Sequence, residues 1–265
     1  MLVTISNIIA IYRKELQSYF ASPLAYGIAA IFWFVTGLFL VAILLSPDGL
    51  IPQVARLDQQ GISETIDVPY EFLQAFLGLM GSISLFILPM LSMGLYAEER
   101  KRGTLELLAT SPLTNWAVAV GKLLGVLTFY ITMLIPLIAC ELIALSASSP
   151  PLPPAVFLLG HAGLILLAAS VLSLGMFISS LTESTILSAI LTFALVLFLW
   201  IIKVASSSIS GPVGKAIGHL SLLTHYTNLV KGIVDTSSLA MFATYIFLGV
   251  FLTAQFIDVL RFQRS

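Results

Sequence analysis

The sequence predicts an all-α polytopic membrane protein, with six transmembrane helices and an amphipathic N-terminal interfacial helix. The first observation behind this prediction is composition: 58% of the 265 residues are hydrophobic and only 9% are charged, against roughly 25% charged in an ordinary soluble domain. The second is a series of charge-poor runs, each close to the about 20 apolar residues that a membrane-spanning helix needs. This composition excludes a soluble enzyme, a nucleic-acid binder and a disordered linker.

The six apolar runs belong to a single transmembrane domain, residues 1–265. Their pattern does not alternate between polar and apolar positions, as the strands of a membrane barrel do. The third run is long and contains Pro136, so we expect it to tilt or kink. The first run is too long for a signal peptide and no small-residue cleavage site follows it, so we expect it to be retained. The predicted spans are residues 24–45, 72–93, 116–145, 156–181, 186–204 and 239–260.

The distribution of lysine and arginine predicts the orientation. Six spans place both termini on one side. The loops of that side carry seven cations in 56 residues, whereas the opposite loops carry four in 71. Cytoplasmic loops are the ones enriched in lysine and arginine. Both termini are therefore expected to be cytoplasmic. We also expect the protein to lie in the cytoplasmic (inner) membrane of a bacterium.

Residues 1–23 precede the first span and mix apolar and charged side chains at helical spacing. Such a helix can lie in the membrane interface, with Arg13, Lys14 and Glu15 on its polar side. The alternative is that these residues only flank and anchor the first span.

The cytoplasmic loop 94–115 concentrates charge, because six of nine consecutive positions from 98 to 106 are charged. Gly103 can end one helix and Thr104 can cap the next. A solvated loop that obeys the positive-inside rule accounts for the basic residues. It does not account for Glu98 and Glu99 before them or for a capped helix after them. We therefore predict a docking element for a cytoplasmic partner.

The outer loop 205–238 combines a serine-rich start with a long apolar stretch, which indicates a re-entrant or interfacial helix. His219 and His225 lie six residues apart. That spacing places them on different faces of a helix, and no cysteine or carboxylate partners accompany them, so a metal site is disfavoured. The single cysteine, Cys140, rules out a disulfide framework.

Ionisable residues within the spans are few. Lys122 is expected to reach the cytoplasmic surface with its long side chain, and Glu141 and His161 lie near outer helix ends. None is placed clearly at the membrane midplane, which disfavours an ion-coupled secondary carrier. Gly78 and Ser82 are spaced for close helix packing. The sequence contains no phosphate-binding glycine loop and no metalloprotease or serine-hydrolase motif.

Three short segments resemble a known family. Residues 98–112, EERKRGTLELLATSP, followed by Gly121 and Lys122, resemble the hallmark of type-2 ABC exporter permeases. Segments around residues 13–15 and 20–26, and the residues His225, Tyr226 and 231–235 before the last span, resemble the gliding-motility branch and its relative in nitrous-oxide-reductase maturation.

The resemblance implies a permease subunit that contains no cofactor itself, whereas ATP and magnesium bind a partner. The implied partners are a cytoplasmic ABC ATPase dimer, a second permease subunit that is the same or related, a possible accessory outer-domain subunit and membrane lipid, but no nucleic acid. The implied ATPase-coupling residues are Glu98, Glu99, Arg100, Gly103, Thr104, Leu105, Glu106, Leu107, Leu108, Ser111 and Pro112. The implied outer re-entrant segment contains His225, Tyr226, Lys231, Gly232 and Asp235.

The function predicted from these features is export of a lipidic, peptide or polysaccharide substrate, driven by ATP hydrolysis on the partner subunit. The chain itself is not expected to be an enzyme. The alternative is a permease-like subunit that transmits ATP-driven motion to an envelope machine without moving a solute.

Overall fold

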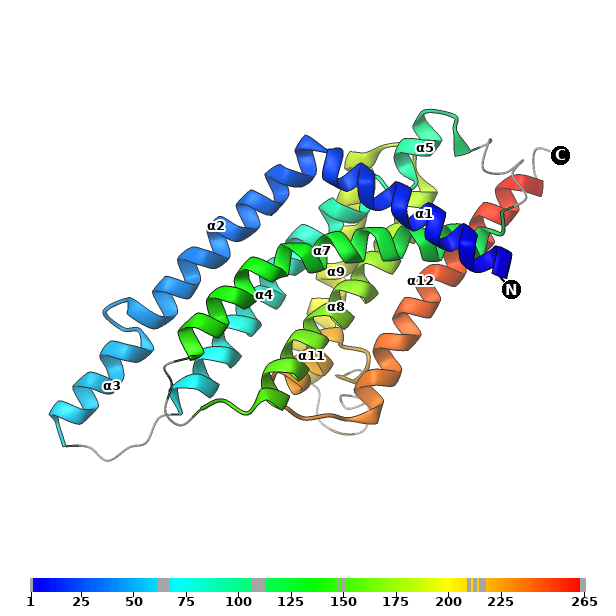
Figure 1. Ribbon diagram of the computed structural model, residues 1–265. Helices are drawn as coiled ribbons and strands as arrows, with labels where there is room; N and C mark the ends of the chain where they lie inside the picture. Colours follow the sequence, from blue (N-terminus) through cyan, green and yellow to red (C-terminus); the bar gives the residue numbers. More distant parts are fainter. Residues whose placement is uncertain are drawn as a thin grey trace.

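The computed structural model describes residues 2–61, 67–105, 113–146, 148, 151–208, 211, 214 and 218–262. Within these ranges the regular structure is helical and contains no strand (Figure 1). The all-α prediction is therefore confirmed.

Six helices of the described chain are long and apolar enough to cross a membrane, in agreement with the six predicted spans. Two of the six continue as helices through an internal proline, Pro89 in one and Pro136 in the other. The ends of the six lie within a few residues of the predicted ones, because the apolar runs decide their lengths. The six are α2 (Pro23–Leu45), α4 (Val68–Ser92), α7 (Asn115–Leu145), α8 (Pro154–Leu181), α9 (Thr185–Ser208) and α12 (Thr236–Phe262).

The N-terminal segment forms the predicted helix, α1 (Leu2–Ala21). It ends before Ser22, whose side chain accepts a hydrogen bond from the backbone N–H of Ala25 and so caps α2. One face of α1 packs closely on α7: a Cβ added at Gly121 would lie only 2.8 Å from Ile11 Cγ2. The helix is therefore held against the bundle, whereas its position in a membrane interface stays a prediction.

Two short helices mark opposite ends of the bundle (Figure 1). Helix α5 (Ala97–Lys101) lies near the end of α12, and α11 (Leu222–Val230) lies at the far end. We call these the α5 end and the α11 end. A further short helix, α3 (Leu50–Gln59), lies at the α11 end, in a segment where the sequence predicted only a loop. It mixes polar and apolar residues, so a search for charge-poor runs misses it.

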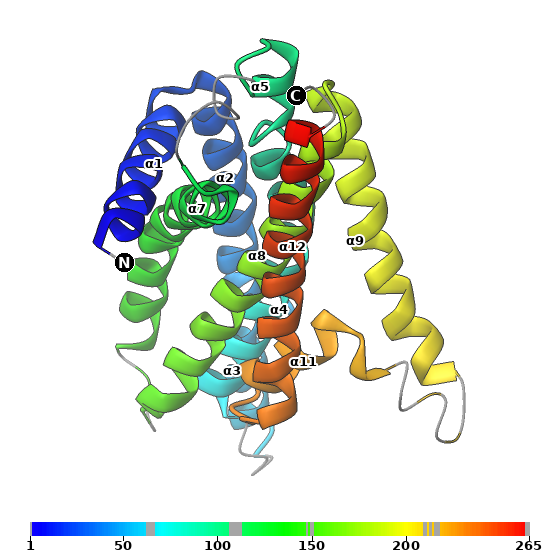
Figure 2. The same cartoon turned by 90° about the vertical axis from the view of Figure 1, so that its right-hand side faces the viewer.

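Helix α8 is central to the packing, since it contacts α4, α7, α9, α11 and α12 (Figure 2). Small residues permit its closest approach to α12, where a Cβ at Gly249 would lie 2.4 Å from the backbone carbon of Ser173. The hydroxyls of Ser170 and Ser173 donate to carbonyl groups of α12. In a lipid environment, packing of this kind contributes more than apolar contact alone.

Gly78 and Ser82 do not mediate close helix packing within the described chain, in contrast to the sequence-based expectation. No atom lies within 4 Å of a Cβ added at Gly78. The Ser82 hydroxyl is exposed and donates to the Gly78 carbonyl oxygen in its own helix. The close approach that this spacing suggested occurs instead at Gly121 and Gly125, against α1.

Candidate functional site

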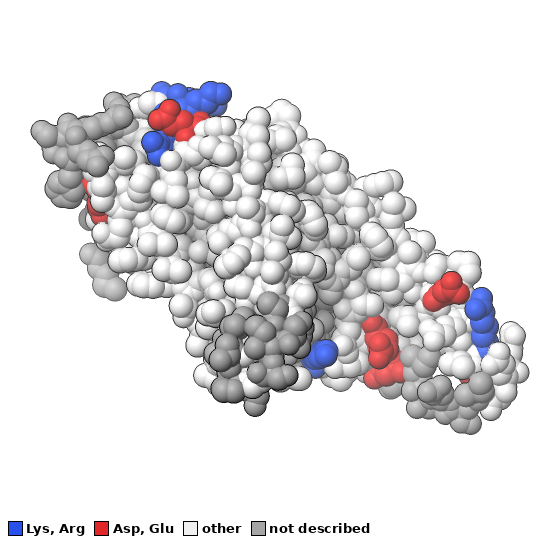
Figure 3. Space-filling view, turned by 180° about the vertical axis from the view of Figure 1, so that it is seen from behind, with Lys and Arg blue, Asp and Glu red and all other residues white. Residues whose placement is uncertain are grey.

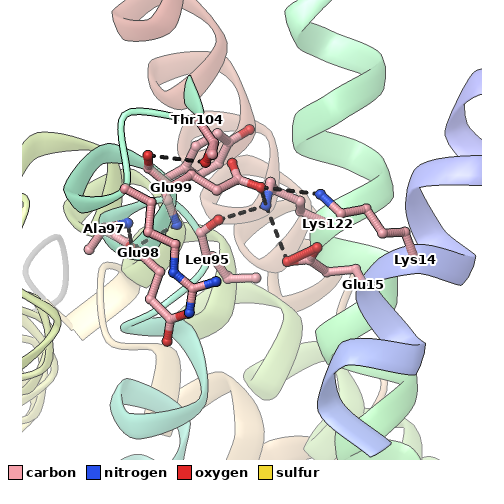
Figure 4. Close-up of polar contacts among 11 residues, drawn as sticks. Lys14, Glu15, Leu95, Ala97, Glu98, Glu99, Thr104 and Lys122 are labelled. Atoms are coloured by element: carbon pink, nitrogen blue, oxygen red, sulfur yellow. Dashed lines mark hydrogen bonds and ion pairs between the residues drawn. The ribbon is translucent and has the colours of Figure 1, made fainter. Parts of the chain in front are cut away.

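The α5 end contains a buried ammonium group at its centre, Lys122 of α7. Its side chain is 2% exposed. The Nζ atom donates to Glu15 Oε1 at 3.1 Å, to Glu99 Oε1 at 2.9 Å and to the Leu95 carbonyl oxygen at 2.7 Å (Figure 4). These three contacts use all three donors of an ammonium group.

The position of Lys122 corrects the sequence-based expectation that its side chain reaches the membrane surface. Two carboxylates and a carbonyl oxygen converge on it from α1, α5 and the α4–α5 link, so the charge is satisfied inside the protein. We call Glu15, Leu95, Glu99 and Lys122 the Lys122 cluster. A search of residues in chain order misses it because its members are far apart in sequence.

The Glu99 carboxylate is directed inward, toward the ammonium group of Lys122 (Figure 4). Lys14 lies 3.6 Å from the same carboxylate oxygen, but its side chain is 70% exposed, so this pair contributes little stability. The other oxygen, Glu99 Oε2, is buried without a hydrogen-bond partner among the described residues. Glu99 therefore connects α5 to α1 and α7 and does not lie on the outer surface of α5.

Arg100 connects the same helix to the opposite side of the bundle. Its Nη1 atom donates to the Ser180 carbonyl oxygen at 2.7 Å, and its Nη2 atom lies 3.6 Å from Glu183 Oε1. The guanidinium carbon also lies 5.9 Å from the ring centroid of Phe256 in α12. Through two adjacent residues, α5 contacts α1, α7, α8, α12 and the α8–α9 turn.

The beginning of α5 is capped by a side chain from another helix. The backbone N–H groups of Tyr96 and Ala97 both donate to Ser179 Oγ of α8, each at 3.0 Å, and Ser179 Oγ donates to the Met93 carbonyl oxygen. The first N–H groups of a helix lack partners within it. Ser179 supplies the acceptor that the local sequence lacks, so α5 forms where α8 places it.

Gly103 ends α5, as the sequence predicted. Its φ is +69°, the left-handed conformation that glycine adopts most easily. The N–H of Gly103 donates to the Arg100 carbonyl oxygen and the N–H of Thr104 to the Glu99 carbonyl oxygen, both at 3.0 Å. This pair of bonds is a Schellman cap.

The exposed surface of α5 is strongly charged. Glu98, Lys101 and Arg102 are exposed, and Glu98 Oε2 lies 3.5 Å from Arg102 Nη2. Figure 3 shows charged side chains at the two ends of the molecule and an uncharged surface between them. Leu105 is half-buried. The predicted coupling residues Glu106, Leu107, Leu108, Ser111 and Pro112 lie outside the described residues, as does the predicted capped helix.

At the α11 end, His225 and Tyr226 are buried and both are hydrogen-bonded. Tyr226 donates to the Leu77 carbonyl oxygen of α4 at 2.5 Å. The two ring nitrogens of His225 contact Ser238 Oγ and the His219 carbonyl oxygen. His219 precedes α11, so the prediction that the two histidines lie on different faces of one helix is wrong: their ring centroids are 6.2 Å apart. No group of three metal-ligating side chains occurs in the described chain.

The residues after α11 connect it to α12. Gly232 has a φ of +75° and ends α11, with the Ile233 N–H donating to the Asn228 carbonyl oxygen. Lys231 is exposed, and its carbonyl oxygen accepts a hydrogen bond from Tyr70. The Asp235 carboxylate accepts hydrogen bonds from the hydroxyl and N–H of Ser237. These bonds stabilise the ionised form and lower the pKa of Asp235.

A second buried contact between ionisable groups lies on α7 and α8. Glu141 is fully buried, and its Oε1 atom lies 3.3 Å from His161 Nε2. The other ring nitrogen, Nδ1, lies 2.9 Å from the Phe157 carbonyl oxygen. Glu141 Oε2 has no hydrogen-bond partner in the described structure. The sequence located both residues near helix ends but did not pair them, although ionisable groups within spans commonly pair.

A model of the family described as ABC-2 family transporter protein matches residues 63–257. The chain belongs to this ABC-2 family. The match begins before α4 and ends within α12, so it includes both α5 and α11 and excludes α1. A comparison with curated proteins found no match. ABC-2 membership makes the chain a permease subunit and implies an ABC ATPase partner and, typically, a dimer.

The Lys122 cluster therefore joins the part of the chain that matches the ABC-2 model to α1, which lies outside it. Glu99 and Lys122 belong to the matched region and Glu15 does not. Because buried Lys122 contacts both Glu15 and Glu99, the N-terminal helix and α5 are joined through the same ammonium group.

Proposed function

We propose that this permease exports its substrate by coupling ATP hydrolysis on a cytoplasmic ABC ATPase dimer to movement of α5. The observation that carries the proposal is the arrangement of α5, which exposes Glu98, Lys101 and Arg102 while Glu99 and Arg100 anchor it to the bundle. A helix that is anchored inward and charged outward can receive a partner's movement and pass it on as a rigid-body displacement.

The orientation in this proposal places the α5 end in the cytoplasm. That end brings together Arg13, Lys14, Arg100, Lys101 and Arg102, from segments far apart in the sequence. Arg56 and Lys231 lie at the α11 end. Cytoplasmic ends carry the excess of lysine and arginine. Both termini would then be cytoplasmic, in the inner membrane of a bacterium.

The complex in this proposal contains two permease subunits, identical or related, and an ATPase dimer that binds ATP and magnesium. An accessory outer-domain subunit would contact the α11 end. Within the ABC-2 family we assign the chain to the gliding-motility and nitrous-oxide-reductase-maturation branch, on the segments at residues 13–15, 20–26 and 225–235. The charge-poor helices suit a lipidic or amphipathic substrate.

Docking is tested by copurification with the ATPase and by ATP hydrolysis of the assembled complex. We expect Lys101→Glu with Arg102→Glu to weaken both measurements, and likewise Leu107→Ala with Leu108→Ala. The matched control is Arg56→Glu, an exposed cation at the α11 end. Unchanged copurification and hydrolysis in both double variants would contradict docking through this element.

Orientation and transport need separate measurements. Single cysteines at Lys101 and Asp58, in a background without Cys140, should label from opposite sides of the membrane, and labelling from one side would contradict the six-span arrangement.

The purified permease alone should neither bind nor hydrolyse ATP. ATP-driven substrate movement in vesicles supports export, whereas coupled hydrolysis without movement would favour transmission of motion to an envelope machine.

A further inference from the structure

A pocket of about 650 Å³ lies beside the Lys122 cluster. Its walls come from α1, from the first turns of α2, from the end of α4 and from α5. Charged residues of α5 that line the pocket have a role in the proposed docking of the ATPase, whereas the pocket itself has none so far.

One wall of the pocket is charged and electrically balanced. It contains three carboxylates, Glu15, Glu98 and Glu99, and three cations, Lys14, Arg102 and Lys122 (Figure 4 labels all of these except Arg102). Buried Lys122 uses all its donors on the protein. Lys14 and Arg102 are 70% and 73% exposed, and their carboxylate partners are 3.6 and 3.5 Å away. These two cations, and the exposed carboxylate of Glu98, therefore retain hydrogen-bonding capacity for a ligand.

Another part of the pocket lining is apolar. It consists of Leu24, Ala25 and Ile28 from α2 and of Met90 and Leu91 from α4. Leu24 and Met90 are also among the exposed apolar residues of the molecule. The apolar wall therefore continues onto the surface of two helices that are long and apolar enough to span a membrane.

A pocket that combines a charged part and an apolar part fits a ligand with a charged headgroup and an apolar chain. We propose that the pocket binds a zwitterionic phospholipid, with its phosphate at Lys14 and Arg102, its ammonium group at Glu98 and the start of an acyl chain along α2 and α4. A soluble anion would find no net positive charge here, because the three carboxylates cancel the three cations. A lipid with a net negative headgroup would leave Glu98 facing another anion.

The bound lipid would contact both α1 and α5, the two elements that the Lys122 cluster already joins. This consequence rests on the proposed function, since it matters for transport only if α5 docks the ATPase. The lipid would fill the space between α1 and α5. A displacement of α5 would then move α1 as well and would not be absorbed by closure of the pocket. Coupled ATP hydrolysis should then require the zwitterionic lipid.

Binding is tested by native mass spectrometry on the purified, delipidated permease. Phosphatidylethanolamine and phosphatidylglycerol are added separately at equal concentration. We expect at least several-fold greater retention of phosphatidylethanolamine. Glu98→Gln with Arg102→Gln should abolish that preference, and Met90→Trp should reduce retention by filling the apolar side. Equal retention of the two lipids, greater retention of phosphatidylglycerol or no retention would overturn the proposal.

Two controls separate lipid binding from folding and from transport. Leu158→Trp adds the same bulk at an exposed apolar position of α8, and Arg56→Gln removes an exposed cation at the α11 end. Both should retain lipid like the wild type, and the pocket variants should keep the wild-type melting temperature. Retention is measured without the ATPase. Lipid binding with failed ATPase docking would count against the proposed function alone, and docking without lipid retention would count against the pocket alone.

Discussion

The two ends of α7 bury charge in different ways. Near the α5 end, Lys122 is surrounded by three acceptors that come from α1, α5 and the α4–α5 link. Near the α11 end, Glu141 contacts one group, His161 of the neighbouring helix, and its second oxygen has no partner in the described structure. The first contact joins four segments of the chain, whereas the second joins two.

The difference predicts that the α5 end is the more strongly cross-linked of the two ends. Removing the central charge of the Lys122 cluster weakens the contacts among four segments at once, whereas breaking the pair of Glu141 and His161 weakens one contact between two helices. The donor and acceptor roles in the pair of Glu141 and His161 follow from its hydrogen bonds. A carbonyl oxygen only accepts hydrogen bonds, so His161 Nδ1 must donate to Phe157. The hydrogen bond between Nε2 and Glu141 then needs one proton, held by either group.

The largest effect is expected from Lys122→Met. This change leaves Glu15 and Glu99 facing each other without their cation, and breaking a buried ion pair costs about 3–5 kcal/mol. Thermal unfolding of the detergent-purified protein measures the loss. Lys14→Met is the matched control and should cost less than about 1 kcal/mol, since this residue is exposed.

A rescue variant sharpens this test of the Lys122 cluster. Glu15→Gln with Glu99→Gln, added to Lys122→Met, removes the uncompensated charges and should restore part of the lost stability. A wild-type melting temperature for Lys122→Met alone would show that the cluster does not hold the α5 end together.

At the α11 end we expect a smaller effect from His161→Ala. The change removes the only hydrogen-bond partner seen for Glu141 in the described structure, and an unsatisfied buried polar group costs about 1–3 kcal/mol. Glu141→Gln should be close to wild type, because its amide group can donate to His161 Nε2. Equal losses for the two variants in the same unfolding assay would contradict the assigned hydrogen-bond pattern.

The close approach of α1 to α7 gives the next comparison. A Cβ at Gly121 would lie 2.8 Å from Ile11 and 3.1 Å from the Ile8 carbonyl oxygen. Gly121→Leu should therefore displace α1 and cost about 1–3 kcal/mol, as overpacked cores do. Gly78→Leu is the control at a glycine with open space around it. Similar melting temperatures for the two variants would mean that α1 is not packed as described.

The smallest effects concern the glycines that end α5 and α11. Gly103→Ala should cost about 1–2 kcal/mol, because a side chain disfavours the left-handed conformation. Gly232→Ala should cost a similar amount, since its φ is +75° and the added Cβ would make only an ordinary contact with Val156, at 3.4 Å. Gly37→Ala, at an ordinary backbone angle and in open space, should not destabilise the protein. Melting temperatures for Gly103→Ala and Gly232→Ala equal to that of Gly37→Ala would contradict the cost assigned to the left-handed conformation.

Local sequence patterns were sufficient to predict the structural features that depend on neighbouring residues alone. The six spans follow from apolar runs of membrane length, and the end of α5 follows from Gly103, because glycine is the residue most easily placed in the left-handed conformation. A helix expected within the apolar stretch of the outer loop is present as α11, whereas its re-entrant position stays a prediction. Helix α3 was missed because its polar and apolar residues alternate around a short helix.

The contacts between segments were decided only by the tertiary structure. In the sequence, Glu15, Glu99 and Lys122 are charged residues far apart along the chain, and Ser179 is one of several serines within a span. Nothing in their spacing indicates that they come into contact. Packing of α1, α7 and α8 brings Glu15, Lys122 and Ser179 to α5, where the carboxylates satisfy a buried ammonium group and Ser179 satisfies two backbone N–H groups. The sequence by itself determined the helices and their lengths, because apolar runs and glycines act locally. Which charges meet depends on helix packing, because the partners are joined by the fold and not by their spacing along the chain.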